Sequence, residues 1–461
     1  MPRFTDPEEK FQWLTTASIP GLVGQLAVPT IISMLITSVY NMADTYFVGT
    51  LGKSAQGAVS VVLPLMAVIQ AIGFTFGNGA GNNVSRLLGQ QKREDAETVA
   101  ATGFFSGVLA GLAILVLGEL FLTPLVSILG ATETILPYAE DYARYILIGA
   151  PWMIGSLVLN NLLRFSGSAT YAMVGITVGG VLNIILDPIF IIVLEQGAAG
   201  AALATILSQL VSFFILLFNT GRGGNIPVRW SRIKWREGPL VNILKGGLPS
   251  LYRQGLASVS TILLNWAAKP FGDAAIAAMG IVSKVTMFSG SAVIGFGQGF
   301  QPVCGFNYGA RLYHRVRDAY WFCIKVGTAF LIVMMAVVFF LAPGIVYRFQ
   351  PGDAEVVRLG TEALRWNILG LPLLTYVIMN NMMLQTVGET GRASILAAAR
   401  QGVFFIPAVL ILPRFLEFKG VMMAQPTSDV CAFLLAIPLS VGFLRKMRGM
   451  EQAEKDLKKN E

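Results

Sequence analysis

The sequence predicts an all-α integral membrane protein with twelve transmembrane helices, arranged as two parallel six-helix lobes related by pseudo-two-fold symmetry. Three observations predict this fold class. Charged residues make up only 13% of the 461 residues, about half of the roughly 25% found in soluble domains. Apolar segments recur along the whole chain and are long enough to cross a hydrocarbon core of ~30 Å. A set of residues in the first half also recurs in the second half at a nearly constant spacing.

Twelve apolar segments bounded by glycine, proline or charge are the predicted spans. Only helices and closed barrels satisfy their backbone hydrogen bonds within lipid. The segments exceed the ~9–11 residues of a membrane barrel strand, so each is expected to be a helix. In order, they cover residues 21–48, 54–83, 97–125, 137–160, 168–194, 198–219, 243–268, 274–303, 318–342, 357–381, 392–412 and 420–444.

An internal repeat divides the chain. Pro29 recurs as Pro249, exactly 220 residues later, and pairs at almost the same spacing follow through six helices. These pairs are Gly52 with Gly272, Asn160-Asn161 with Asn380-Asn381, Gly167 with Gly388, and Gly200 with Gly420. An even number of spans in each copy makes the two copies parallel. We therefore expect an N-terminal lobe at 1–219, a cytoplasmic linker at 220–242, a C-terminal lobe at 243–445 and a charged cytoplasmic tail at 446–461.

Basic residues predict the orientation. Most Lys and Arg residues fall at the ends and loops that face the cytoplasm if the N-terminus is cytoplasmic, including the linker and the tail. The positive-inside rule then places both termini in the cytoplasm. We expect a multi-pass protein of the inner (plasma) membrane, in contact with membrane lipid. The net charge of +8 follows from this orientation, and nucleic-acid binding is disfavoured.

Catalytic and nucleotide-binding motifs are missing from the sequence. His314 is the only histidine, the three cysteines show no CxxC spacing, and no GxxxxGK[ST] motif occurs. We therefore expect a transporter rather than an enzyme, without a cofactor and driven by an ion gradient. We also expect a monomer.

Acidic residues inside predicted helices are the main functional signal, because a charge within the bilayer is costly and persists for a reason. Asp44 lies in the first helix and Asp187 in the fifth, where Asn183 precedes it by one helical turn on the same face. Tyr142 and Thr205 lie at similar depths, roughly 6–12 Å below the outer surface at ~1.5 Å per residue. Their oxygens suit a proton or a hard cation such as sodium.

Three motifs also resemble the multidrug and toxic compound extrusion (MATE) family. They are Asp44-Thr45-Tyr46-Phe47-Val48-Gly49, then Asn161-Leu162-Leu163-Arg164 before Gly167, and Leu182-Asn183 with Leu186-Asp187-Pro188. The resemblance implies an antiporter that exports bulky, often cationic amphipathic compounds in exchange for protons or sodium. It places the ion site at Asp44, Tyr142, Asn183, Asp187 and Thr205. The second lobe departs from some relatives: its seventh helix has no acid, and Asp429 matches no family motif.

The sequence leaves open the lining of the substrate cleft and the choice between two transport functions. The substrate cleft is expected to involve Met34, Met42, Met153, Met287 and Lys284, because flexible thioethers accommodate varied ligands. Lys284 either pairs with a carboxylate or a substrate, or packs its stem and extends its amine toward water. The alternative function is a flippase of lipid-linked saccharides in the same superfamily, which would favour a cleft lined with arginines. A channel or an intramembrane enzyme has less support.

Overall fold

The first lobe contains six long helical spans. The computed structural model describes residues 4, 6–51, 53–235 and 238–460, and these residues form helices and loops only. A short helix α1 (Pro7–Thr16) precedes the lobe. The spans are α2 (Ile19–Gly49), α3 (Lys53–Gly89), α4 (Arg93–Leu120) with the short α5 (Leu122–Ile128), α6 (Leu136–Phe165), α7 (Ala169–Pro188) with the π-helical turn η1 (Ile189–Val193), and α8 (Gly197–Thr220).

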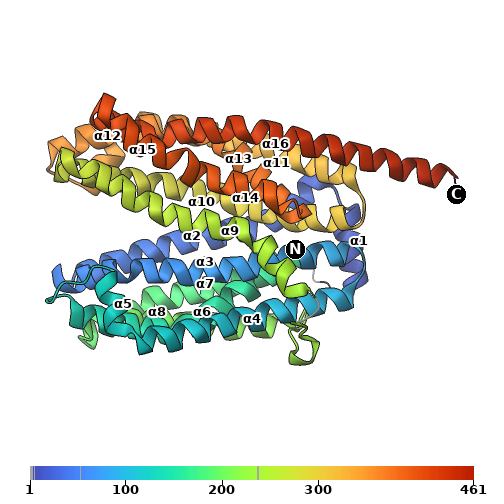
Figure 1. The fold of residues 1–461 in the computed structure, drawn as a ribbon, viewed down its shortest axis with the longest axis horizontal. Helices are drawn as coiled ribbons and strands as arrows, with labels where there is room; N and C mark the ends of the chain where they lie inside the picture. The colour runs from blue at the N-terminus through green and yellow to red at the C-terminus, as the bar shows by residue number, and fades with distance from the viewer. Residues whose placement is uncertain (1–3, 5, 52, 236–237, 461) are drawn as a thin grey trace.

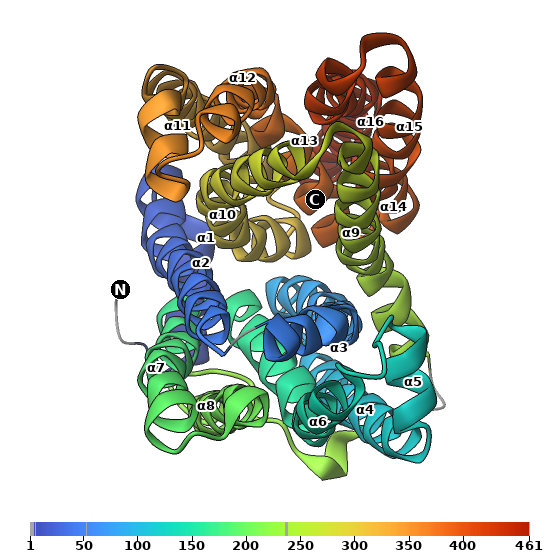
Figure 2. The same ribbon diagram turned by 90° about the vertical axis from the view of Figure 1, so that its left-hand side faces the viewer.

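The second lobe repeats this order. Its elements are α9 (Pro239–Ala268), the turn η3 (Lys269–Phe271), α10 (Asp273–Gly309), α11 (Tyr313–Phe349), α12 (Ala354–Leu369) with α13 (Leu371–Val387), α14 (Thr390–Ala398) with η4 (Ala399–Val403) and α15 (Phe405–Leu416), and α16 (Phe418–Asn460). The two lobes lie side by side, with α2 and α3 of the first facing α9 and α10 of the second (Figures 1 and 2).

The predicted fold class is confirmed. Ten described helices are long and apolar enough to cross a membrane, and α12 with α13, bent by 46°, adds an eleventh span. Helix α9 is the twelfth: its 30 residues measure ~45 Å at ~1.5 Å per residue, and it runs alongside the others (Figure 1). Each predicted segment coincides with one of these spans. The helices extend further than predicted; α16 continues to Asn460, and Glu451 pairs with Arg317 at 3.0 Å.

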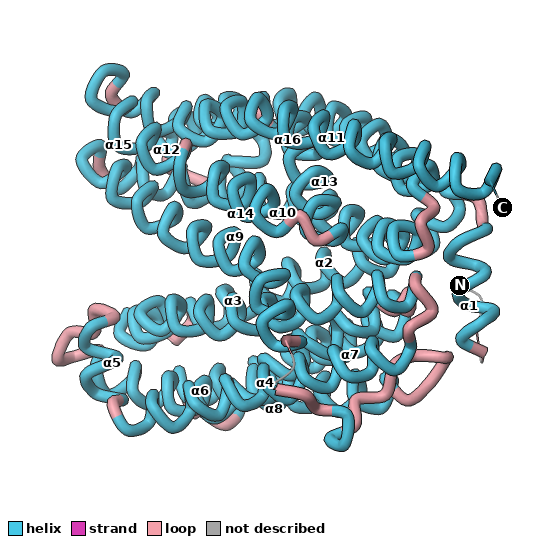
Figure 3. Tube along the Cα trace, turned by 45° about the vertical axis from the view of Figure 1, so that its right-hand side comes forward, coloured by secondary structure: helices cyan, strands magenta, loops and turns pink. Residues whose placement is uncertain are grey.

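The lobes meet toward one end of the bundle. Helix α1 lies there, and the end of α16 projects there (Figure 1); we call it the termini end. At the opposite end the lobes diverge (Figure 3). Glycines allow α10 to pack closely on α2 here. A Cβ on Gly295 would lie only 2.7 Å from the Ile31 Cα, and one on Gly299 only 2.4 Å from the Ala27 Cα, so a larger side chain would clash with the α2 backbone.

Hydrogen bonds between the lobes also gather in this half. Arg164, buried at the end of α6, donates to the Gln298 carbonyl at 3.0 Å and to the Gln301 Oε1 at 2.7 Å. The same guanidinium donates to the Asn78 and Asn161 side chains of its own lobe. Further bonds between the lobes join Thr386 to Asn82, Asn78 to Ser250, Thr30 to Gly295, and Ser38 to Ser291.

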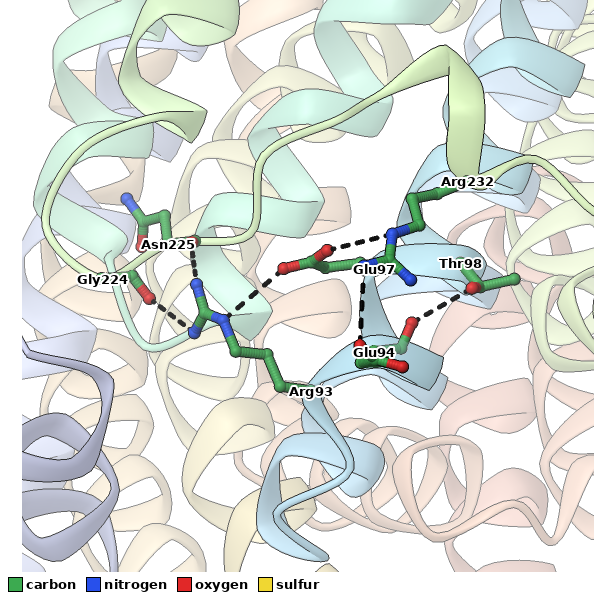
Figure 4. A network of polar contacts seen from close by, with 7 residues as sticks. All are labelled: Arg93, Glu94, Glu97, Thr98, Gly224, Asn225 and Arg232. Carbon is green, nitrogen blue, oxygen red and sulfur yellow. Dashed lines mark hydrogen bonds and ion pairs between the residues drawn. The ribbon is translucent and has the colours of Figure 1, made fainter.

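The segment between α8 and α9 is tied to the first lobe. Arg93 of α4 donates to the Asn225 carbonyl at 2.7 Å and pairs with Glu97, while Arg232 pairs with Glu94 and Glu97 (Figure 4). Helix α9 begins at Pro239, four residues before the predicted start of the second lobe. Residues 236–237 of the predicted linker and residue 461 of the predicted tail lie outside the described residues.

Candidate cation site

Two parallel helices bring the predicted aspartates together. Gly180 of α7 packs against Ile36 and Tyr40 of α2, since a Cβ on Gly180 would lie 3.0 Å from the Ile36 Cγ2 and 3.2 Å from the Tyr40 Cδ1. Both helices run away from the termini end (Figure 1). One further turn on each therefore places Asp44 beside the Asn183–Asp187 stretch. The charges of Asp44 and Asp187 are close enough to interact.

Asn183 organises the buried part of this site. Its Nδ2 donates to the Asp187 Oδ1 at 3.2 Å and to the Thr205 Oγ1 at 3.5 Å. Asn183, Asp187 and Thr205 are all buried, although they come from two different helices. Three of the five residues predicted for the ion site thus share hydrogen bonds. Asp44 is close enough for its charge to interact with that of Asp187.

Tyr142 takes a different partner from the one expected. It is buried, and its ring carries the hydroxyl close enough to Asp44 and Asp187 to interact with both charges. Its hydroxyl, however, donates to the Met66 Sδ of α3 at 3.7 Å. Sequence reasoning missed Met66, because nothing in the sequence around it separates it from the other methionines of the spans.

The site has more buried acceptors than donors. The Asp44 Oδ1, the Asn183 Oδ1 and the Asp187 Oδ2 are buried, and none receives a hydrogen bond from a described residue. Leaving such groups unpaired costs ~1–3 kcal/mol each, and more for a charged group. A proton or a hard cation with oxygen ligands would satisfy them. Among the described residues, no three His, Cys, Asp or Glu side chains are placed to hold a metal ion by themselves, so a sodium site here would rest on two carboxylates and neutral oxygens.

The deep acid of the second lobe is already neutralised. Asp429 accepts from the Arg400 Nε at 2.8 Å and from the Gln425 Nε2 at 2.9 Å. Glu362, the other acid considered in that lobe, lies 3.9 Å from Lys419. Sequence reasoning missed the role of Arg400, because the partners are 29 residues apart on different helices.

The residues predicted for the substrate cleft divide into two groups. Met42 and Met287 are 49% and 58% exposed, Lys284 is also exposed, and Met34 is half-buried. Met153 is only 6% exposed and packs in the first-lobe core. Its sulfur lies against Gly149 within the lobe, and its place in a cleft wall stays a prediction.

Known proteins resemble this chain along nearly its whole length. The MatE family model matches residues 29–189 and 249–411, two stretches that begin 220 residues apart. The multidrug export protein MepA of Staphylococcus saprophyticus is 27% identical over 450 residues, covering 97% of this chain and 99% of that protein. MepA of Staphylococcus haemolyticus is 29% identical, covering 93% and 94%.

Solved structures show the same architecture. A crystal structure of MATE in complex with MaL6 has a TM-score of 0.90 and 27% identity, covering 95% of this chain and 99% of that chain. A multidrug resistance MATE family transporter in an outward-facing conformation has a TM-score of 0.90 and 25% identity, covering 97% and 100%. The repeat, the twelve spans and the matched residues agree, and the chain belongs to the MatE family of membrane transporters.

Proposed function

We propose that this protein is a secondary antiporter that exports bulky amphipathic compounds, in exchange for protons or sodium ions that bind beside Asp44 and Asp187. The observation that carries the proposal is the group of three buried oxygens without a donor. Such a group gains most from a cation, because the cation satisfies the lone pairs and neutralises the carboxylates together. The relatives named as multidrug export proteins support the substrate class.

The mechanism we propose is alternating access. The termini end is the cytoplasmic end by the positive-inside rule, and the protein acts as a monomer in the plasma membrane. Hydrogen bonds from Arg164 and its neighbours hold the lobes together at that end. Export requires those bonds to break so that the lobes can separate there. The ion drives the cycle only if it binds the two conformations with different affinities.

The test is ethidium efflux from energised cells that express the chain, with and without a sodium gradient. Asp187→Asn keeps the size of the side chain and removes its charge, so it is expected to abolish gradient-driven efflux. Asp429→Asn is the matched control, because this acid is already paired with Arg400, and it is expected to retain efflux at equal expression. Dependence on sodium would identify the ion.

Two results would count against the proposal. Efflux by Asp187→Asn at the wild-type rate would remove the ion site from the mechanism. An absence of efflux of any amphipathic dye by the well-expressed wild type would favour the flippase of lipid-linked saccharides instead.

A further inference from the structure

One face of α10 follows the first lobe along the length of the helix. Gly299 and Gly295 pack on α2, and the Ser291 Oγ lies 3.1 Å from the Ser38 Oγ. With 3.6 residues per turn, position 284 lies within about 20° of positions 291 and 295 around the helix axis. Lys284 therefore lies on the same face of α10, two turns beyond Ser291 toward the end at which the lobes diverge.

The side chains around Lys284 are exposed rather than packed. The Ser38–Ser291 contact is the last hydrogen bond between α2 and α10 in this direction among the described residues. Beyond it, Met287 and Phe288 of α10 and Met42 of α2 are all more than 40% exposed. Lys284 is exposed too, and its Nζ makes no hydrogen bond or ion pair with a described residue.

Charge is scarce on the helices that face each other here. Inside these helices, beyond the charged first residues Lys53 of α3 and Asp273 of α10, residues 39–49, 55–71, 254–268 and 274–290 hold two charged residues, Asp44 and Lys284. The Asp44 Oδ1 is buried, and its charge interacts with Asp187 within the first lobe. Within these four stretches Asp44 is half-buried and Lys284 is exposed, so the exposed charge is positive.

We infer that Lys284 selects for substrates that carry a negatively charged group, such as a carboxylate, next to an apolar body. This inference rests on the proposed export function and defines its substrate class. An ammonium group beside methionine and phenylalanine side chains attracts a carboxylate more strongly than it would in bulk water, because the surroundings are less polar. The thioethers adapt to the apolar part. Zwitterions gain this attraction, whereas a purely cationic compound such as ethidium lacks it and is expected to bind more weakly without being excluded.

The inference departs from the cationic substrates that the family resemblance implies. A cation-selective site needs an exposed acid at the substrate surface. In this chain the acids within the spans on this side are Asp44 and Asp187, whose charges interact within the first lobe and which are proposed to bind the coupling ion. The exposed Asp273 lies at the outer start of α10, about 16 Å along the helix from Lys284. The substrate surface is left with Lys284.

The experiment compares two dyes that differ by one ester: a rhodamine with a free carboxylate, which is a zwitterion, and its methyl ester, which is a cation. Binding to the purified full-length protein is measured by fluorescence anisotropy. We expect the wild type to bind the free acid at least about fivefold more tightly, corresponding to ~1 kcal/mol. Lys284→Gln is expected to lose this preference, and Lys284→Arg to keep it. Lys269→Gln, which removes another exposed lysine near the same end, is the matched control and is expected to behave as wild type.

Binding separates this inference from the proposed function. A preference for the ester, or a preference for the free acid that Lys284→Gln leaves unchanged, would overturn the inference, as would the absence of wild-type binding to the free acid. Loss of the preference in Lys284→Gln would support it even if efflux turned out not to depend on Asp187, a result that would reject only the coupling mechanism.

Discussion

Asn183 donates its side-chain amide to the Asp187 carboxylate across one turn of α7, with 3.2 Å between the Nδ2 and the Oδ1. The same nitrogen lies 3.5 Å from the Thr205 Oγ1 on α8. The amide is therefore held with its donor turned toward its two neighbours. Its own Oδ1 and the second oxygen of Asp187 are left as buried acceptors. The hydrogen bond therefore fixes the positions of the two side chains, but it leaves two of their buried oxygens without a donor.

Asn183→Ala is expected to weaken ion binding more than it weakens the fold. The change removes one neutral oxygen ligand and frees the Asp187 side chain to rotate. Loss of one hydrogen-bond partner of ~1.4 kcal/mol raises the half-saturating ion concentration for efflux roughly tenfold. The measurement is efflux rate against sodium concentration or external pH.

Asn367→Ala is the control for this prediction, because Asn367 is a buried amide of the second lobe that donates to the backbone carbonyls of Ala363 and Met422. It is expected to lower stability without changing the half-saturating concentration. Equal shifts in both variants would mean that Asn183 is merely structural.

Thr386 and Asn82 provide a direct test of lobe separation. The Thr386 Oγ1 donates to the Asn82 Oδ1 at 2.8 Å across the lobe boundary, and both side chains are buried. In an Asn82→Cys, Thr386→Cys variant, a short bifunctional thiol reagent that a reductant can cleave is expected to link the lobes. Efflux should then stop and should return on reduction, because the proposed alternating-access mechanism requires the termini end to open.

Each single cysteine variant is the control and should retain efflux after the same treatment, since it lacks the second introduced thiol across the lobe boundary. The partly exposed native Cys431 is replaced by serine in all variants. Full export by the cross-linked double variant, with the link verified by mass spectrometry, would exclude separation of the lobes at this end.

The spans could be predicted from the sequence because a helix that crosses lipid needs about 20 mostly apolar residues. Each segment meets this requirement by its own composition, whatever its neighbours are. The repeat added the two-lobe arrangement. Asp44, Asn183 and Asp187 could be singled out as candidates because a polar residue in a span is rare. The burial of Met153 and the contact of Met66 with Tyr142 could not be predicted, because a methionine is equally common on a packed face and an open face. Whether a methionine is packed or exposed depends on which other helices lie against it, and the local sequence contains no information about those helices.

The partner of Asp429 could not be predicted from the sequence either, because Arg400 lies on a different helix. Arg400 and Asp429 form an ion pair at 2.8 Å, with Asp429 only 6% and Arg400 26% exposed. Asp429→Asn leaves the partly exposed guanidinium without its acid, which costs roughly 1–3 kcal/mol. We expect a lower melting temperature for the purified protein, together with an unchanged ion dependence of efflux.

The double variant Arg400→Gln, Asp429→Asn is expected to recover part of the stability, since it removes both charges. A change in ion dependence caused by Asp429→Asn alone would show that the second lobe takes part in coupling.

Helix α1 contacts both lobes at the termini end. The Lys10 Nζ donates to the Ser168 Oγ and the Asn225 Oδ1 of the first lobe, each at 2.7 Å. On the other side, the Asn307 Nδ2 of the second lobe donates to the Leu14 carbonyl at 3.1 Å. Separation of the lobes must therefore break one of these attachments, and the attachment at Lys10 depends on pH.

Burial, together with the nearby Arg93 guanidinium, lowers the pKa of Lys10 from 10.5 to about 7. Below pH 7 the lysine is charged whether α1 is docked or not. Between about 7 and 10.5 it is neutral when docked and charged when undocked, so the undocked state binds more protons and docking strengthens as pH rises. Between pH 6 and 8.5, the docking equilibrium should shift about 30-fold toward the docked state.

Hydrogen-exchange protection of the backbone of residues 7–16, corrected for the intrinsic effect of pH, measures this equilibrium. The wild type should be better protected at pH 8.5 than at pH 6. Lys10→Met carries no titratable group, so it should be less protected than the wild type at high pH and should show no pH dependence of its own. Protection that falls with rising pH, or that changes equally in both proteins, would show that the Lys10 ammonium does not control the docking of α1.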